Sequence, residues 1–135
     1  MIKEDYVSLE IAKLLKDKGF LKGVDLRMTQ NLSFYDNIGL SYNINKYYDS
    51  LIQDKIDFVV APTLQMAMKW LREVHNIGIF PSTYTHIADR KTIHSYGTAI
   101  INLKTYELMT DSYLSNDTYE DAVETAIKYC LENLI

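Results

Sequence analysis

The chain has 135 residues, of which 47% are hydrophobic and 24% are charged. This length fits one domain, and the composition excludes a disordered or fibrous chain. Fourteen lysines and arginines against eighteen acidic residues give a net charge of −4, which argues against general binding to nucleic-acid phosphates. We therefore expect a single soluble domain over residues 1–135.

Cysteine content and hydropathy indicate the compartment. The one cysteine, Cys130, cannot form an internal disulfide, and the first residues lack the basic and then apolar stretch of a secretory signal. No apolar run approaches the roughly 20 residues that cross a bilayer. The sequence therefore predicts a cytoplasmic protein that is not inserted into a membrane.

Three helices are predicted from capping residues and apolar stripes. The first runs over Ser8–Lys18, with Ser8 as N-cap and Gly19 as the left-handed residue that ends it. Thr63 caps a second helix, which ends near Asn76. Thr118 caps the last helix, in which the acidic residues of the first turn suit the positive end of the helix dipole.

Strands are predicted between these helices. Apolar residues alternate with polar ones over Leu40–Ile44, and Val24–Met28 shows a shorter version of the pattern. Three later segments are rich in Ile, Thr and Tyr, with turns near Ala88–Lys91 and around Lys104. These segments are Ile77–Tyr84, Thr92–Leu103 and Tyr106–Thr110. The predicted fold class is α+β, a small antiparallel meander with about three helices packed on one face.

Two stretches carry a resemblance to a known group. The sequences Ala61–His75 and Thr118–Glu132 resemble small uncharacterised proteins that are encoded in prophages and mobile elements of gut bacteria. The resemblance covers the C-terminal part of the chain and implies a similar pair of helices flanking a strand meander. It also implies that the protein is encoded in a prophage or mobile element. It supplies no catalytic residue, because the group carries no established activity.

Histidines and tyrosines are the candidates for acid–base chemistry. His86 and His94 are expected to face each other across a hairpin that turns near Asp89–Lys91, with Tyr84 and Tyr96 nearby. Among side chains, histidine is the one whose unperturbed charge changes near neutral pH. Residues that face each other in a sheet are, however, usually only packed together on its surface. The third histidine, His75, is interpreted as a favourable charge at the end of its helix.

Other catalytic and cofactor patterns are missing from the sequence. There is no Gly-x-Ser-x-Gly motif of a serine nucleophile, and the scattered glycines match neither the P-loop nor the dinucleotide-binding fingerprint. The histidine spacing is not that of a metal site. Cys130 falls on the predicted buried stripe of the last helix, where a thiol behaves as a small hydrophobic group. We expect no cofactor and no metal.

Candidate binding residues are aromatic or acidic. Eleven tyrosines are many for this length, and Tyr42, Tyr47 and Tyr48 fall close together in the chain. Trp70 is expected either in the core or at the edge of a groove. Helix capping does not explain Glu107 and Asp111, which belong to a stretch from 107 to 124 without lysine or arginine.

The leading hypothesis from these patterns is a non-enzymatic protein-interaction module of a prophage or mobile element. Its partner is an unknown protein or a second copy of the chain. One alternative is a small enzyme or ligand-binding protein with the His/Tyr site. Another is a local contact with nucleic acid, or mimicry of DNA charge by the acidic edge.

Overall fold

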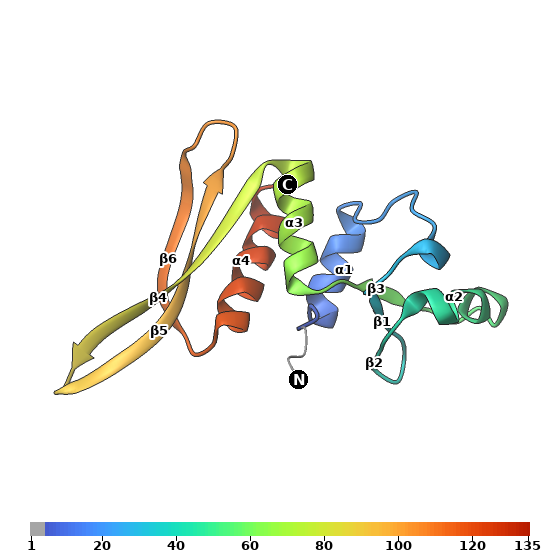
Figure 1. Ribbon diagram of the computed structural model, residues 1–135, viewed down its shortest axis with the longest axis horizontal. Coiled ribbons are helices and arrows are strands. Elements are labelled where there is room, and N and C mark those ends of the chain that lie inside the picture. Colours follow the sequence, from blue (N-terminus) through green and yellow to red (C-terminus); the bar gives the residue numbers. More distant parts are fainter. Residues whose placement is uncertain (1–4) are drawn as a thin grey trace. The chain divides into compact units, whose positions relative to one another are not determined.

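The structure is a computed structural model, and it describes residues 5–135 apart from the side chains of His86 and of residues 111–116. The chain divides into two compact units, Met1–Ala67 and Met68–Ile135, with the division inside helix α3 (Leu64–His75). Each unit contains one three-stranded antiparallel sheet (Figure 1). The α+β class is confirmed, with two small sheets where the sequence predicted one. That residues 1–135 act as one domain stays a prediction.

Helix α1 (Leu9–Asp17) opens the first unit and ends as the sequence predicts. The Ser8 side chain accepts a hydrogen bond from the backbone N–H of Ile11 at 3.4 Å. Gly19 follows the helix with φ +91°, and the N–H of Phe20 donates to the carbonyl of Leu15 at 2.9 Å. This is the hydrogen bond that closes a left-handed helix terminus.

The rest of the first unit differs from the sequence prediction in two places. Residues expected as a strand near Val24–Met28 form a 3₁₀ helix, η1 (Leu26–Met28), capped by Asp25. The strand expected over Leu40–Ile44 stops at Ser41, because Asn43 is left-handed with φ +62° and helix α2 (Ile44–Gln53) begins directly after it. A helix forms from residue 44 onward in place of a longer strand, because Ile44, Tyr48 and Leu51 repeat at helical spacing.

The sheet of the first unit has the strand order β2-β1-β3. Its strands are β1 (Ser33–Tyr35), β2 (Leu40–Ser41) and β3 (Val59–Ala61). One cluster of buried core residues in this unit is formed by Leu32, Phe34, Ile44 and Leu51. The Tyr35 hydroxyl donates a 2.7 Å hydrogen bond to the carbonyl of Val7, which ties β1 to the segment before α1.

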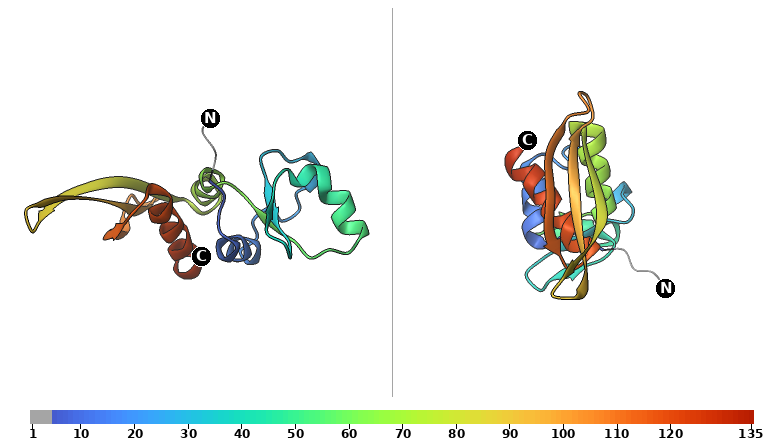
Figure 2. Two further views of the ribbon diagram at one scale, coloured as in Figure 1. Left: turned by 90° about the horizontal axis from the view of Figure 1, so that it is seen from below. Right: turned by 90° about the vertical axis from the view of Figure 1, so that its left-hand side faces the viewer.

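The second unit is a meander with one helix packed on it. Its strands are β4 (Ile77–Ala88), β5 (Lys91–Asn102) and β6 (Leu108–Asn116), in the order β4-β5-β6. Helix α4 (Tyr119–Asn133) contacts all three strands and lies on one side of the sheet (Figure 2). Its buried face includes Val123, Ile127 and Cys130. The sequence predicts a buried stripe over Tyr119, Ala122, Val123, Ala126, Ile127, Cys130 and Leu134. Its five middle positions are confirmed, whereas Tyr119 is exposed, Leu134 is half-buried and Leu131 is buried.

The caps of α3 and α4 are those that the sequence predicts. Thr63 accepts a hydrogen bond from the N–H of Met66 at 3.2 Å, and Thr118 accepts one from the N–H of Asp121 at 3.1 Å. Asn76 ends α3 in a left-handed conformation, with φ +56°. Among residues 5–135, the structure contains no helix that combines the length and the apolar character needed to span a bilayer.

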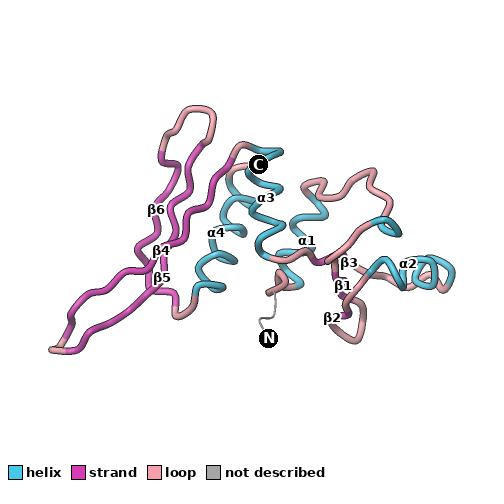
Figure 3. The backbone as a smooth tube through the Cα atoms, viewed as in Figure 1, coloured by secondary structure: helices cyan, strands magenta, loops and turns pink. Residues whose placement is uncertain are grey.

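The β4–β5 hairpin turns over two residues. Ala88 pairs with Lys91, and the two residues between them, Asp89 and Arg90, have φ values of 51° and 63°. Positive φ at both central positions is the geometry of a type I′ turn, which favours glycine at the second position. Figure 3 shows the two strands continuing beyond the end of β6 to this turn.

We expect Arg90→Gly to raise the free energy of unfolding by about 0.5–1 kcal/mol, because glycine adopts the left-handed conformation without the steric cost that arginine has. Urea unfolding of the two proteins measures the difference. Lys91→Gly is the matched control, since Lys91 lies in β5 at the next position, and there glycine weakens the strand. Equal effects of the two substitutions would contradict the assigned turn.

Candidate functional site

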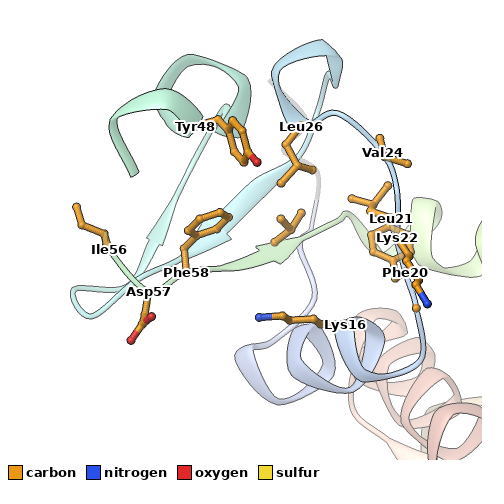
Figure 4. A pocket seen from close by; sticks show the side chains of 12 residues that line it. Lys16, Phe20, Leu21, Lys22, Val24, Leu26, Tyr48, Ile56, Asp57 and Phe58 are labelled. Carbon is orange, nitrogen blue, oxygen red and sulfur yellow. The ribbon is translucent and has the colours of Figure 1, made fainter. Parts of the chain in front are cut away.

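An apolar pocket lies within the first unit. Its volume is about 490 Å³, within the range of common ligand sites. Figure 4 shows Tyr48 and Phe58 on one side, Leu21 and Val24 on the other, and Leu26 between them. The pocket is lined by Lys16, Gly19, Phe20, Leu21, Lys22, Val24, Leu26, Tyr48, Ile56, Asp57, Phe58 and Val60. Most of these side chains are apolar, so the pocket can hold an apolar group.

Three separate elements contribute to the walls of the apolar pocket. Leu26 comes from η1 and Tyr48 from α2, while Val60 lies in β3 and Phe58 directly before it. The rings of Tyr48 and Phe58 meet edge to face, with centroids 6.2 Å apart. Edge-to-face packing of this kind adds to the stability that burial gives. This wall is therefore formed by packed side chains and is present before any ligand binds.

The lip of the apolar pocket is the loop that follows α1. Gly19, Leu21 and Gly23 all have positive φ, at 91°, 61° and 79°. For leucine this left-handed conformation costs roughly 1–2 kcal/mol. The N–H of Lys22 donates to the carbonyl of Gly19, and the N–H of Val24 to that of Leu21, each at 3.1 Å. Two tight turns in succession hold Leu21 against the core and place its side chain in the pocket wall.

Charges are distributed unevenly around the apolar pocket. Lys16 and Lys22 are exposed and line it. Asp57 also lines the pocket, but Figure 4 shows its carboxylate pointing away from the cavity. Nearby, Arg27 is ion-paired with Asp25 at 3.1 Å, and the hydrogen bond from the Arg27 side chain lowers the pKa of that carboxyl below its usual value. The pocket edge is therefore positive at the two lysines.

A second cavity, the tyrosine groove, lies beside α2. Its volume is about 600 Å³, and its lining includes Tyr42, Tyr47 and Asp36. Tyr42 is 58% exposed and Tyr47 is 50% exposed, so both rings present apolar surface to solvent. The structure thus places two of the three predicted tyrosines in one groove. The third, Tyr48, lines the apolar pocket instead.

A row of aromatic rings connects the two cavities. Tyr47 and Phe34 have centroids 6.1 Å apart, and Phe34 and Phe58 are 6.3 Å apart. Phe58 then meets Tyr48 in the wall of the apolar pocket. Ile56 lines both cavities. Tyr47 and Tyr48 therefore belong to one aromatic layer, although they open into different cavities, whereas Tyr42 packs on Tyr6 with ring centroids 5.5 Å apart.

The other predicted binding residues belong to the second unit. Trp70 is half-buried and packs edge to face on His75, with centroids 4.6 Å apart. His75 ends α3 as predicted, and its Nε2 atom is buried with no hydrogen-bond partner among the described residues. Glu107 is exposed in the turn before β6, whereas the side chain of Asp111 lies outside the described part of the structure. Trp70, His75 and Glu107 line neither of the two cavities.

The expected facing pair of histidines is wrong. His94 pairs with Thr85, and the backbone of His86 pairs with Ile93. A three-residue turn at Asp89–Lys91 would place His86 opposite His94, whereas the turn has two residues, and this difference shifts the register by one position. The side chain of His86 itself lies outside the described part of the structure.

The remaining candidates for acid–base chemistry are divided between the two faces of the hairpin. Tyr96 pairs with Thr83, so it shares a face with His94, whereas Tyr84 lies on the opposite face. Thr85 Oγ1 and His94 Nδ1 are 3.1 Å apart. The hydroxyl of Tyr84 accepts a hydrogen bond from Ser82 at 3.3 Å. Neither cavity described above contains any of these residues.

Cys130 is fully buried in α4, as predicted from the apolar stripe. Burial raises the pKa of its thiol to about 12, so the thiol stays protonated at neutral pH. Within residues 5–135, leaving aside the undescribed side chains, no three His, Cys, Asp or Glu residues group together as a metal site.

Sequence reasoning missed most of the apolar pocket. Apolar residues in the loop after α1 are brought against β3, which lies far away in the chain, and no local pattern marks this contact. The helical spacing of Ile44, Tyr48 and Leu51 indicates α2 in the sequence. The alternation of apolar and polar residues over 40–44 indicates a strand instead, and the prediction followed this alternation.

Comparisons with protein families, curated proteins and solved structures gave no match to this chain.

Proposed function

We propose that this protein is an interaction module without catalytic activity, and that a segment of a partner protein inserts into the apolar pocket. The observation that carries the proposal is the pocket itself, about 490 Å³ with mostly apolar walls. Preformed pockets of this kind accept the anchor side chains that dominate protein interfaces. The genomic context, a prophage or mobile element, stays a prediction.

Exposed apolar side chains at the pocket support this proposal. Val24 is 46% exposed and Ile56 is 40% exposed, and both line the pocket. A partner that covers them removes apolar surface from water, which favours association. Tyr48 adds a half-buried ring with a polar end, a common feature of interface centres.

The proposal is tested by selecting binders from a displayed library of random short peptides on the intact chain. We expect enriched peptides with a large apolar anchor, and about tenfold weaker binding to Val24→Asp, because a carboxylate in the apolar wall is poorly solvated when a peptide covers it. Affinities are measured by fluorescence anisotropy. Met28→Asp is the matched control, since Met28 is 81% exposed and lines neither cavity.

Three results would overturn the proposal. The first is that no peptide is enriched over selection on an unrelated protein. The second is that enriched peptides bind both aspartate variants and the parent equally. The third is that sedimentation shows a dimer of the parent that Val24→Asp dissociates, because the occupant would then be a second copy of the chain.

A further inference from the structure

We infer that the segment which fills the apolar pocket is acidic as well as apolar, and that Lys16 and Lys22 contact its carboxylates. The inference rests on the proposed function and adds the charge of the partner segment. Two features carry it: the position of the two lysines at the pocket, and the local excess of positive charge around them.

The local charge is opposite to that of the whole chain. Residues 13–22 contain four lysines and one aspartate, a net charge of +3, whereas the chain has a net charge of −4. Two of these lysines, Lys16 and Lys22, line the apolar pocket. A positive edge around an apolar cavity favours ligands that combine an apolar body with negative charge.

Neither pocket lysine is neutralised within the described part of the chain. Neither Lys16 nor Lys22 takes part in an ion pair with a described residue. Figure 4 shows the Lys16 side chain along one edge of the pocket and Lys22 beside Phe20, with the carboxylate of Asp57 pointing away. The two ammonium groups are thus available to a ligand.

Helix electrostatics accounts for only one of the two lysines. Lys16 lies in the last turn of α1, where a cation suits the negative end of the helix dipole. Lys22 lies beyond the helix, between Leu21 and Gly23 with their positive φ values, so the dipole does not explain it. The turns of this loop hold Lys22 next to the apolar wall that Leu21 and Val24 form.

The occupant is a short segment of another protein, with a large apolar residue flanked by Asp or Glu. Six of the lining residues come from the single stretch 16–24, so a peptide that lies along this stretch meets apolar and positive side chains in succession. A fatty-acid anion shares the chemistry of an apolar body with a carboxylate, and it is treated as a separate outcome of the test.

The test uses the peptides selected on the intact chain. We expect an excess of Asp and Glu beside the apolar anchor, and binding that weakens as salt is raised. The double variant Lys16→Glu/Lys22→Glu should bind the best peptide about tenfold or more weakly, since reversal replaces attraction by repulsion. Lys46→Glu/Lys69→Glu is the control with the same charge change, and it should bind within about twofold of the parent.

The control lysines are exposed and line neither cavity. Replacing Asp and Glu in the peptide by Asn and Gln should remove the difference between the parent and the Lys16→Glu/Lys22→Glu variant. Equal weakening by the two double variants would overturn the inference, because it would show an effect of net charge alone.

Failure of the inference and failure of the proposed function give different results. The inference alone is overturned if the enriched peptides need Val24 but show no excess of Asp and Glu, and bind the Lys16→Glu/Lys22→Glu variant as well as the parent. The proposed function then still holds. Absence of any enriched peptide overturns both. Saturable binding of dodecanoate that needs both lysines, without peptide binding, overturns both in favour of a fatty-acid site.

Discussion

Replacing Leu51 with alanine is expected to lower the free energy of unfolding by about 3 kcal/mol, whereas Ile52→Ala should change it by less than about 0.5 kcal/mol. The two residues are neighbours on α2, but Leu51 is 5% exposed and Ile52 is 54% exposed. Leu51 belongs to the core with Leu32, Phe34 and Ile44, so truncation leaves a cavity among side chains that cannot collapse fully.

Urea unfolding followed by circular dichroism measures both variants. The pair is matched because each substitution removes an aliphatic side chain from the same helix, and alanine has the higher helix propensity in both cases. Similar losses at the two positions would show that residues 44–53 do not present this face to the core.

The second large effect is a loss of folding stability at alkaline pH, which we expect from the titration of Cys130. The pKa of Cys130 rises from 9.0 to about 12 in the folded protein, because burial disfavours the thiolate. A raised pKa stabilises the fold fully below pH 9.0, where both states bind the proton, and this contribution is lost as the pH rises toward 12. The loss is about 1.4 kcal/mol per pH unit, or roughly 4 kcal/mol across this window.

Comparison with Cys130→Ala separates this effect from the titration of lysines and tyrosines. Unfolding free energies are measured between about pH 8 and about pH 11. The alanine variant lacks the thiol, so above pH 9.0 its stability should fall less steeply than that of the parent by about 1.4 kcal/mol per unit. Parallel curves for the two proteins would contradict a buried, protonated Cys130.

Helix ends were predictable from sequence because their signals are local. Ser8, Thr63 and Thr118 each cap a helix as expected, since a cap needs only a side-chain oxygen within three residues of the orphan N–H. Gly19 and Asn76 end helices for a similarly local reason, because both adopt positive φ. The order of elements in the second unit was predictable from local patterns too, namely the segments rich in Ile, Thr and Tyr and the turns between them.

Register and the candidate site were not predictable in this way. The partner of His94 depends on whether the hairpin turns over two residues or three, and a single-residue difference replaces His86 by Thr85. The apolar pocket depends on bringing the loop after α1 against Phe58 and Val60, which are far along the chain. Tyr48 was predicted as a binding residue and lines the apolar pocket, but its neighbours in space were not visible in the sequence.

The β4–β5 hairpin has a further consequence for amide hydrogen exchange. Strand β5 has partners on both sides only between Tyr96 and Ile101, whereas toward the turn it is paired with β4 alone. Near the turn Ile87 is 77% exposed, and little apolar burial holds the strands together there. Opening the turn end therefore exposes few contacts, and its amides should exchange through local fluctuations. Amides near Ile100, which is 2% exposed, should exchange only when the unit unfolds, giving a gradient of protection along one pair of strands.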